Sequence, residues 1–453
     1  MSATENIANF IAGTKAQDIP PQVYALAKRN VIDTLGVAIG ASQSAVAESL
    51  RKLAAPTQQG EAFLWNGQGR AAVTDAAWMN GALAHALDFD DGGVALTPMH
   101  PSSPVLPALW ALGESVNCTG LDLLAAYIVG LEVECKLASA ISLSHYDHGW
   151  HATAVLGTFG AAAGAAWLLG LTDAQMRTAI GIAASMAGGL RANFGTMTKP
   201  LHAGLAARNG LTAAQLAQAG WSANQDVLES KKGFFEVFQC GEVGDLKLGA
   251  PFHFESPGVS IKRFPSCSAT HHCIEAMIAL KQQHGLSAEM IERIDCRVHA
   301  VSYQALRKEP KVESAEAARF SLHFTTALVL LEGSVELKHF SNPTLNRADI
   351  NRFMQKVHVG IHPELETLAS KKQAFGQVDV QLKDGSKLSH RATEVRGRAP
   401  LFLSDADVDA KFLGCAEPAL GRAKAQELLT ALRSLESYKD ICTLLPNAFE
   451  LAS

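Results

Sequence analysis

The potentially reactive side chains of this 453-residue sequence are densest between residues 85 and 103. The segment HALDFDD, at 85–91, holds three carboxylates and an imidazole, and MHPSSP, at 99–104, adds a second imidazole. Ser102 or Ser103 is expected to cap a helix that begins with the following proline, so that His100 lies beside a helix N-terminus. Unpaired N–H groups and the helix dipole favour an anion there. These residue types predict proton transfer on a molecule that carries carboxylates; a capped, solvated surface loop is the alternative.

Basic side chains also stand at three other predicted helix starts. Lys199 and His202 lie in TKPLH, at 198–202, where a lysine opposes the dipole of its own helix unless an anion lies between them. A solvated lysine is the alternative. The glycine-punctuated loop just before this helix carries Arg191. The other two starts are GWH at 149–151, which ends in His151, and KRFPSCSATHHC at 262–273, which includes Lys262 and His271.

The segment at 262–273 must also be considered as a metal site or as the source of a nucleophile. Cys267, His271 and Cys273 are residue types that bind zinc, but their spacing matches no common structural zinc pattern. Cys267 has no recognisable partner that would make it a catalytic thiolate. We therefore expect no metal centre and no cysteine nucleophile here.

The composition is that of a folded cytoplasmic protein. Hydrophobic residues make up 48% of the sequence and charged residues 18%, which excludes a disordered chain. A net charge of −5 without long basic runs argues against nucleic acid as a partner. Eight cysteines without a framework spacing, and an N-terminus without a signal-peptide pattern, favour the cytoplasm. The uncharged stretch 152–171 is as long as a membrane span, but its alanines and glycines favour a buried helix and no membrane association.

The hydrophobic pattern changes twice along the chain. It repeats at helical spacing up to about residue 250 and again after Pro400. Between these parts it alternates as in half-buried strands, with a Lys-Asp-Gly hairpin turn at 383–385. We therefore expect a mainly α fold, with a first helical part over 1–260, an α+β domain over 261–396 and a C-terminal helical part over 397–453.

Helix and strand limits follow from the same pattern. Thr4 is expected to cap the first helix, and Pro20-Pro21 to open the second. The other predicted helices are 74–87, 104–116, 121–142, 152–169, 173–187, 201–219, 270–284, 317–331, 405–412 and 421–435, and the predicted strands are 291–303, 356–360, 377–381 and 387–390.

Five motifs, in their order along the chain, resemble the MmgE/PrpD family, which includes 2-methylcitrate dehydratase, cis-aconitate decarboxylase and iminodisuccinate epimerase. The resemblance covers roughly residues 5 to 445. It implies a large all-helical domain built from both chain ends, a smaller α+β lid domain between them, and a homodimer. The motifs are HALDFDD, the following HPS, GWHxTxxxGTFG, TKPLHxG and KxxPSCxxTH.

The resemblance also implies which side chains act in the site. Matching positions are carried over from the family's motifs, and two residues are added to them: Arg191, from the loop before TKPLHxG, and His202, from that motif. We assign catalytic roles to Asp88, His100, Lys199 and His271, and substrate binding to His151, Lys262, Arg191 and His202.

Two positions depart from the family members that are similar to the decarboxylase. Gly92 stands where those members have a threonine after DFDD, and Phe324 stands where they have a tyrosine. The chain therefore lacks two of their hydroxyl groups, and His323 is a candidate to replace one. The loop before His100 is also longer than in those members.

The chemistry follows from the charges that the reaction creates. Removing a proton from carbon next to a carboxylate builds negative charge on that carboxylate, so fixed cations must surround it. A histidine can act as acid or base, and Asp88 can orient a histidine. We therefore expect a lyase of the dehydratase type that needs no cofactor or metal and acts on a small di- or tricarboxylate. The alternatives are an epimerase of the iminodisuccinate type, a decarboxylase of the cis-aconitate type and an inactive carboxylate-binding protein.

Overall fold

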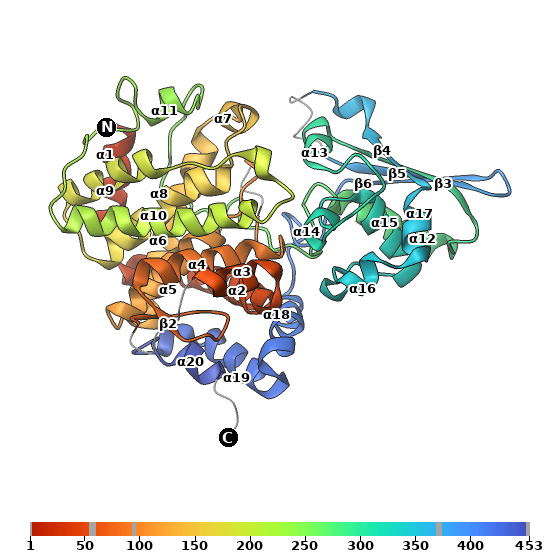
Figure 1. Cartoon of the computed structure of the whole chain (residues 1–453). Coiled ribbons are helices and arrows are strands. Elements are labelled where there is room, and N and C mark those ends of the chain that lie inside the picture. Colours follow the sequence, from red (N-terminus) through yellow and green to blue (C-terminus); the bar gives the residue numbers. More distant parts are fainter. Residues whose placement is uncertain (1, 54–59, 93–96, 368–373, 450–453) are drawn as a thin grey trace. The chain divides into compact units, whose positions relative to one another are not determined.

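The computed structural model describes residues 2–53, 60–92, 97–367 and 374–449 of the chain. These residues form two compact units (Figure 1). The first unit comprises Met1–Asn193, Met197–Ile261 and Leu403–Ser453, and therefore contains both ends of the chain. The second comprises Phe194–Thr196 and Lys262–Phe402, so it extends beyond the expected limit at 396.

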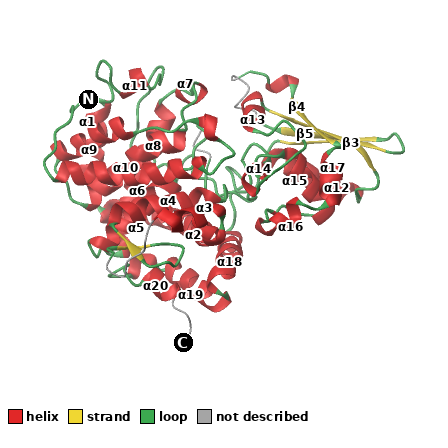
Figure 2. Cartoon of the chain, viewed as in Figure 1, coloured by secondary structure: helices red, strands yellow, loops and turns green. Residues whose placement is uncertain are grey.

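The first unit consists almost entirely of helices, and the prediction of a mainly α fold is confirmed (Figure 2). A two-stranded antiparallel sheet, β1 (Ala62–Phe63) with β2 (Arg70–Ala71), joins α3 to α4. The helices of the first unit are α1 (Ala3–Gly13), α2 (Pro21–Gly40), α3 (Ala45–Leu53), α4 (Val73–Ala86), α5 (Ser102–Ser115), α6 (Gly120–Ala140), α7 (Ser144–Asp147), α8 (Ala152–Leu168), α9 (Asp173–Met186), α10 (Thr198–Gln218), α11 (Phe234–Val237), α18 (Asp405–Leu420), α19 (Arg422–Arg433) and α20 (Leu444–Phe449).

Small residues let the central helices of this unit approach closely. Helix α8 packs against α6 and α10, and α10 packs against α4. A Cβ atom added to Gly130 of α6 would lie 2.6 Å from the carbonyl oxygen of Gly160 in α8. The uncharged stretch that begins at Ala152 is helix α8, which is buried from Ala152 to Ala166. No helix in the described part of the chain is both long and apolar enough to span a bilayer.

The second unit is built around a four-stranded sheet whose strands lie in the order β4-β3-β5-β6. Strand β3 pairs in parallel with β4 and antiparallel with β5, and β5 and β6 form the predicted hairpin. Helices α12 and α15 pack against this sheet and share its hydrophobic core (Figure 2). Its elements are α12 (His271–His284), β3 (Ile291–Val298), α13 (Ala300–Ala305), α14 (Ala315–Ala318), α15 (Leu322–Glu332), α16 (Asn342–Leu345), α17 (Ala348–Met354), β4 (Val357–Ile361), β5 (Gly376–Leu382) and β6 (Lys387–Ala392).

Two elements of the second unit differ from their prediction. The strand expected over 291–303 ends at Val298, because the His299 side chain accepts the Val301 N–H and caps helix α13. The helix expected over 317–331 is interrupted after α14. Ser321 caps the new helix α15 there by accepting the Phe324 N–H.

Two helices of the first unit also differ at their ends. Ser2, and not Thr4, caps α1, and the Thr4 hydroxyl donates to Glu229 over 2.8 Å. Helix α18 continues past the expected end at 412 to Leu420, because Val408, Phe412, Cys415 and Ala416 form one buried stripe.

His253 is a buried histidine that the core of the first unit holds in its neutral form. It is 1% exposed, and neither ring nitrogen has a hydrogen-bond partner among the described residues. Burial, with a smaller effect from Lys136, lowers its pKa from 6.5 to about 4. Protonation of this ring therefore opposes folding.

Replacing His253 by leucine is expected to change how stability depends on pH. The folded-state pKa lies below the unfolded value, so the stability due to the neutral ring is complete above pH 6.5 and is lost as the pH falls towards 4. At about 1.4 kcal/mol per pH unit, the natural protein should lose about 2 kcal/mol relative to the variant between pH 6.5 and 5. Denaturant unfolding at both pH values measures this difference.

The natural protein must be compared with His253→Leu because buried carboxyl groups change the stability of both with pH in the opposite direction. Burial raises the pKa values of Asp91 and Glu114 to about 7, which favours folding at low pH in both proteins equally. His148→Leu, at an exposed site of the same unit, is the matched control. A stability difference between His253→Leu and the natural protein that stays constant with pH would contradict the prediction.

Candidate active site

Five side chains from the end of α4, the loop after it and the start of α10 meet in the first unit. They are His85, Asp88, Asp90, His100 and Lys199, called here the Lys199 cluster. The Lys199 ammonium donates to Asp88 Oδ1 over 2.6 Å and lies 2.8 Å from His85 Nε2. His100 Nε2 is 3.8 Å from the same Asp88 oxygen. Three of the four predicted catalytic side chains, Asp88, His100 and Lys199, thus lie together.

A backbone reversal directs Asp88 towards Lys199. Helix α4 ends at Ala86, and Asp88 follows with a φ of +50°, in the left-handed region that aspartate tolerates better than most residues. The C-terminal segment fixes the next residue, since Lys411 of α18 donates to the Phe89 carbonyl over 2.6 Å. Lys411 also forms a buried ion pair of 2.6 Å with Asp33 of α2.

A hydrogen bond to the backbone determines the tautomer of His100, whose two ring nitrogens lie near Asp88 and Asp90. His100 Nδ1 lies 2.7 Å from the carbonyl oxygen of Asp91, and a carbonyl can only accept, so Nδ1 carries a proton. Nε2 is then the basic nitrogen of the neutral ring, and it is the atom nearest Asp88. The Thr153 hydroxyl accepts the His100 backbone N–H over 3.0 Å.

The N-terminus of α5 is occupied by a carboxylate of the protein itself. Helix α5 begins at Ser102 without a side-chain cap, so the predicted capping by Ser102 or Ser103 is wrong. The Ser102 N–H donates to Asp91 Oδ1 over 3.2 Å, and the Ser102 hydroxyl bonds to both Asp91 and Tyr127. Asn30 donates to the other oxygen of Asp91. The prediction that this helix end receives a substrate anion is therefore not supported, because Asp91 takes that place.

Two predicted substrate-binding histidines extend the cluster. The Nδ1 atoms of His151 and His202 are 3.1 Å apart, and the rings of His85 and His151 lie 6.0 Å apart. Burial, then the nearby charge of Lys199, lowers the pKa of both His151 and His202. Arg191, the third predicted binding residue from this part of the chain, lies in the loop before α10. Its guanidinium stacks on Tyr146 and donates to the Tyr146 carbonyl. Arg191 therefore supports the segment before α8.

Lys262 and His271 belong to the second unit, and both are buried. His271 lies in the first turn of α12, as predicted, and is the first residue of that helix; its Nε2 lies 3.1 Å from the Ser266 carbonyl. Phe324, which stands in place of the tyrosine of the decarboxylase-like members, is fully buried in the core against Phe340. His323 is buried beside it, and burial lowers its pKa to about 4.

Charge in the Lys199 cluster is divided between the Lys199 ammonium and the anionic carboxylates, and His85 is neutral. Burial opposes ionisation of Asp90, but His85 and His100 outweigh it and hold the Asp90 pKa well below its usual value. Burial lowers the pKa of His85 to about 3; Asp90 opposes this shift, and Lys199 and His100 add to it. The Lys199 ammonium is thus stabilised by the Asp88 carboxylate and by the neutral His85 ring, neither of which adds a second positive charge.

The donor set of this cluster could in principle hold a metal ion. One ligand atom each from His85, Asp88, Asp90 and His100 lies within 4.8 Å of the others, whereas Cys267, His271 and Cys273 form no such group within the described ranges. Lys199, however, already places a positive charge 2.6 Å from Asp88 and 2.8 Å from His85. The residues therefore fit a fixed ammonium better than a metal.

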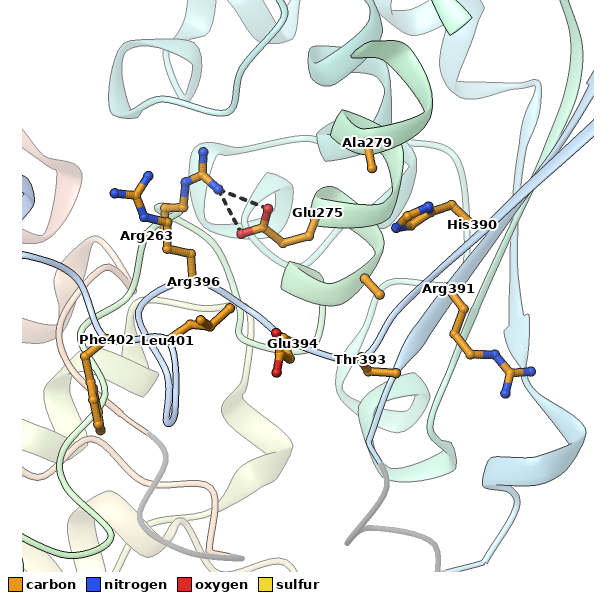
Figure 3. A pocket seen from close by; sticks show the side chains of 11 residues that line it. Arg263, Glu275, Ala279, His390, Arg391, Thr393, Glu394, Arg396, Leu401 and Phe402 are labelled. Carbon is orange, nitrogen blue, oxygen red and sulfur yellow. Dashed lines mark hydrogen bonds and ion pairs between the residues drawn. The ribbon is translucent and has the colours of Figure 1, made fainter. Parts of the chain in front are cut away.

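A separate cavity of about 460 Å³ lies within the second unit (Figure 3). Two of the three arginines that line it are paired with carboxylates of the protein: Arg263 with Glu275 over 2.9 Å and Arg391 with Glu364 over 3.0 Å. None of the predicted site residues lines this cavity. It is therefore not the site that the motifs predict.

Sequence reasoning missed the roles of His85 and Asp90. Both lie in the HALDFDD motif, but only Asp88 was selected from it. A signal was available, since His85 falls in the last turn of α4, three residues before Asp88, and Asp90 follows directly after the reversal. Spacing alone does not show that this loop folds back onto the helix end.

Comparison with known proteins agrees with these motifs. The MmgE/PrpD N-terminal domain matches residues 5–245, and the MmgE/PrpD C-terminal domain matches residues 264–437. Curated relatives include the cis-aconitate decarboxylases, which are lyases, of Homo sapiens and Mus musculus. They are 32% and 31% identical to this chain, over 100% and 98% of it and 96% and 92% of their own lengths. That of Aspergillus terreus is 26% identical over 98% of the chain and 95% of its own length. The chain therefore belongs to the MmgE/PrpD family.

Proposed function

We propose that this protein is a lyase that removes CO₂ from a small unsaturated tricarboxylate such as cis-aconitate. The observation that carries the proposal is the Lys199 cluster. It brings together a buried ammonium, an anionic carboxylate and a histidine whose basic nitrogen faces that carboxylate. Similarity to cis-aconitate decarboxylases along the whole chain supports the same reaction.

Each group of the cluster has a defined task in this proposal. Loss of CO₂ leaves an electron pair on the substrate, which must be neutralised by a proton delivered to carbon. Protonated His100 delivers that proton from Nε2, and Asp88 stabilises the protonated ring. Lys199 stabilises the negative charge that spreads onto a remaining carboxylate. Lys262 and His271 are assigned to substrate binding and catalysis on the family pattern alone.

Product analysis tests the proposal directly. The purified protein, incubated with cis-aconitate, should release CO₂ and form a five-carbon unsaturated dicarboxylate, which proton NMR identifies. His100→Gln should lower the rate by about 10²- to 10⁴-fold, the usual contribution of an acid–base group. No CO₂ release from cis-aconitate, or unchanged turnover in His100→Gln, would overturn the proposal.

Dehydration of a hydroxy-tricarboxylate is the second candidate, and Gly92 favours it. A Cβ atom at Gly92 would lie 3.6 Å from His100 Nδ1, so the hydroxyl that the decarboxylase-like members carry at this position is missing next to the acid–base histidine. In the same assay, citrate and methylcitrate would then lose water without releasing CO₂. An epimerase would instead take up solvent deuterium without forming an alkene.

The homodimer is likewise a proposal that stands on the family pattern. Light scattering during size-exclusion chromatography of the full chain tests it, with a mass of about twice 48.1 kDa expected. A mass of one chain would contradict it.

A further inference from the structure

His85 is a buried histidine that joins two charged groups of the cluster and has no role in the chemistry described so far. Its side chain is fully buried, as is that of Asp90. Nδ1 lies 2.8 Å from Asp90 Oδ2, and Nε2 lies 2.8 Å from the Lys199 ammonium. The three groups therefore form a continuous chain of hydrogen bonds.

The direction of the protons in this chain is fixed by its two ends. An ammonium group has only donors, so His85 Nε2 must present its lone pair to Lys199. The ring proton is then on Nδ1, which donates to the Asp90 carboxylate. Burial, helped by Lys199 and His100 and opposed by Asp90, lowers the pKa of His85 to about 3, which agrees with a neutral ring.

We infer that Asp90 and His85 form a positioning pair that aims the Lys199 ammonium at the reacting carboxylate. Asp90 selects the tautomer of His85, and His85 Nε2 and Asp88 Oδ1 then direct two of the three N–H groups of Lys199. Neither His85 nor Asp90 exchanges a proton with substrate in this arrangement. The inference rests on the proposed function, because it assigns a purpose to the direction of Lys199.

If His85 served in packing alone, the activity of its variants would not depend on where their hydrogen-bonding atoms lie. His85→Gln places an amide oxygen near the position of Nε2 and can still accept from Lys199. His85→Asn places its amide near Nδ1 and loses that acceptor, and His85→Phe keeps the ring but loses both nitrogens. Asp90→Asn keeps the shape but can donate to Nδ1, which moves the ring proton to Nε2, against the ammonium.

The rates of these variants test the inference. Asp90→Asn, His85→Asn and His85→Phe should each lower kcat by about 10²-fold or more, as expected when the orientation of a catalytic group is lost. His85→Gln should keep a larger kcat than His85→Asn by about tenfold. His253→Gln, at a buried histidine outside the cluster, is the matched control and should keep the natural kcat. Equal rates for His85→Gln and His85→Asn would overturn the inference.

A second measurement needs no substrate and therefore separates this inference from the proposed function. Nitrogen-15 NMR of histidine-labelled protein reports the tautomer of each ring, and the His85 signals are those that disappear in His85→Gln. The expected result is a neutral ring with the proton on Nδ1, which changes in Lys199→Met. A proton on Nε2, or on both nitrogens, overturns the inference even if the lyase activity is found. The expected tautomer without activity on any carboxylate would support the pair and contradict the proposed function.

Discussion

Lys199→Met is expected to lower the rate of CO₂ release by about 10³-fold and to destabilise the first unit. The catalytic loss follows because one preorganised charged donor contributes about 10²- to 10³-fold to a reaction that develops negative charge in a buried site. Stability falls because Asp88 then keeps a buried charge without its ion-pair partner, with both side chains only 7% exposed in the natural protein. Breaking a buried pair from one side costs about 3–5 kcal/mol. Steady-state kinetics and denaturant unfolding measure the two effects.

The double variant Lys199→Met, Asp88→Asn separates catalysis from stability. It removes both charges, so most of the lost stability should return, because a buried pair contributes little net stability over neutral groups of similar size. Turnover should stay low, since the ammonium is still absent. If the double variant regained activity together with stability, Lys199 would be a structural residue and the proposed site would be wrong.

The parts of the site that could be predicted are those that a helix start defines. Lys199 follows the first residue of α10 and His271 begins α12, as their motifs indicated. The helix dipole and the polar residue types at these positions are local properties of the sequence. The prediction failed at α5, where a residue eleven positions away in the chain, Asp91, takes the N-terminal N–H group of Ser102. The path of the intervening loop decides that contact, and spacing does not determine a loop path.

The same distinction applies to the fold. The strands near 357, 378 and 388 could be predicted because one face of the sheet is buried by α12 and α15, which imposes an alternating pattern. The interruption before α15 could not be read from hydrophobicity, since both sides of it are buried and apolar. At this break the Arg319 carbonyl accepts the Cys267 N–H over 2.9 Å, a contact between segments far apart in the sequence.

The distance between Lys199 and Asp88 also depends on two glycines that lie away from the cluster. Asp88 follows α4 and Lys199 is near the start of α10, so the spacing of these two helices sets the spacing of the two charges. Gly81 of α4 and Gly204 of α10 meet where the helices touch: a Cβ atom on Gly81 would lie 2.9 Å from the Cα atom of Gly204. Close helix packing thus brings Lys199 and Asp88 into contact.

Gly204→Ala is therefore expected to damage both stability and activity. The added Cβ atom would lie 2.2 Å from the Trp78 carbonyl oxygen and 3.0 Å from the Ala82 nitrogen. Both are backbone atoms of α4, so a side-chain rotation cannot relieve the contact and the helices must separate. Overpacking of this kind costs about 3 kcal/mol. Any separation lengthens the 2.6 Å contact between Lys199 and Asp88, so kcat should fall even at temperatures where the variant is fully folded.

Gly414→Ala provides the matched control for this prediction. Gly414 lies within helix α18, and a Cβ atom there would meet nothing within 4 Å. The same substitution at this position should therefore raise stability by up to about 1 kcal/mol, the helix propensity gained on replacing glycine by alanine. Denaturant unfolding and kcat are measured for both variants. If Gly204→Ala matched Gly414→Ala in stability and kept the natural kcat, helix contact at Gly81 and Gly204 would not set the geometry of the Lys199 cluster.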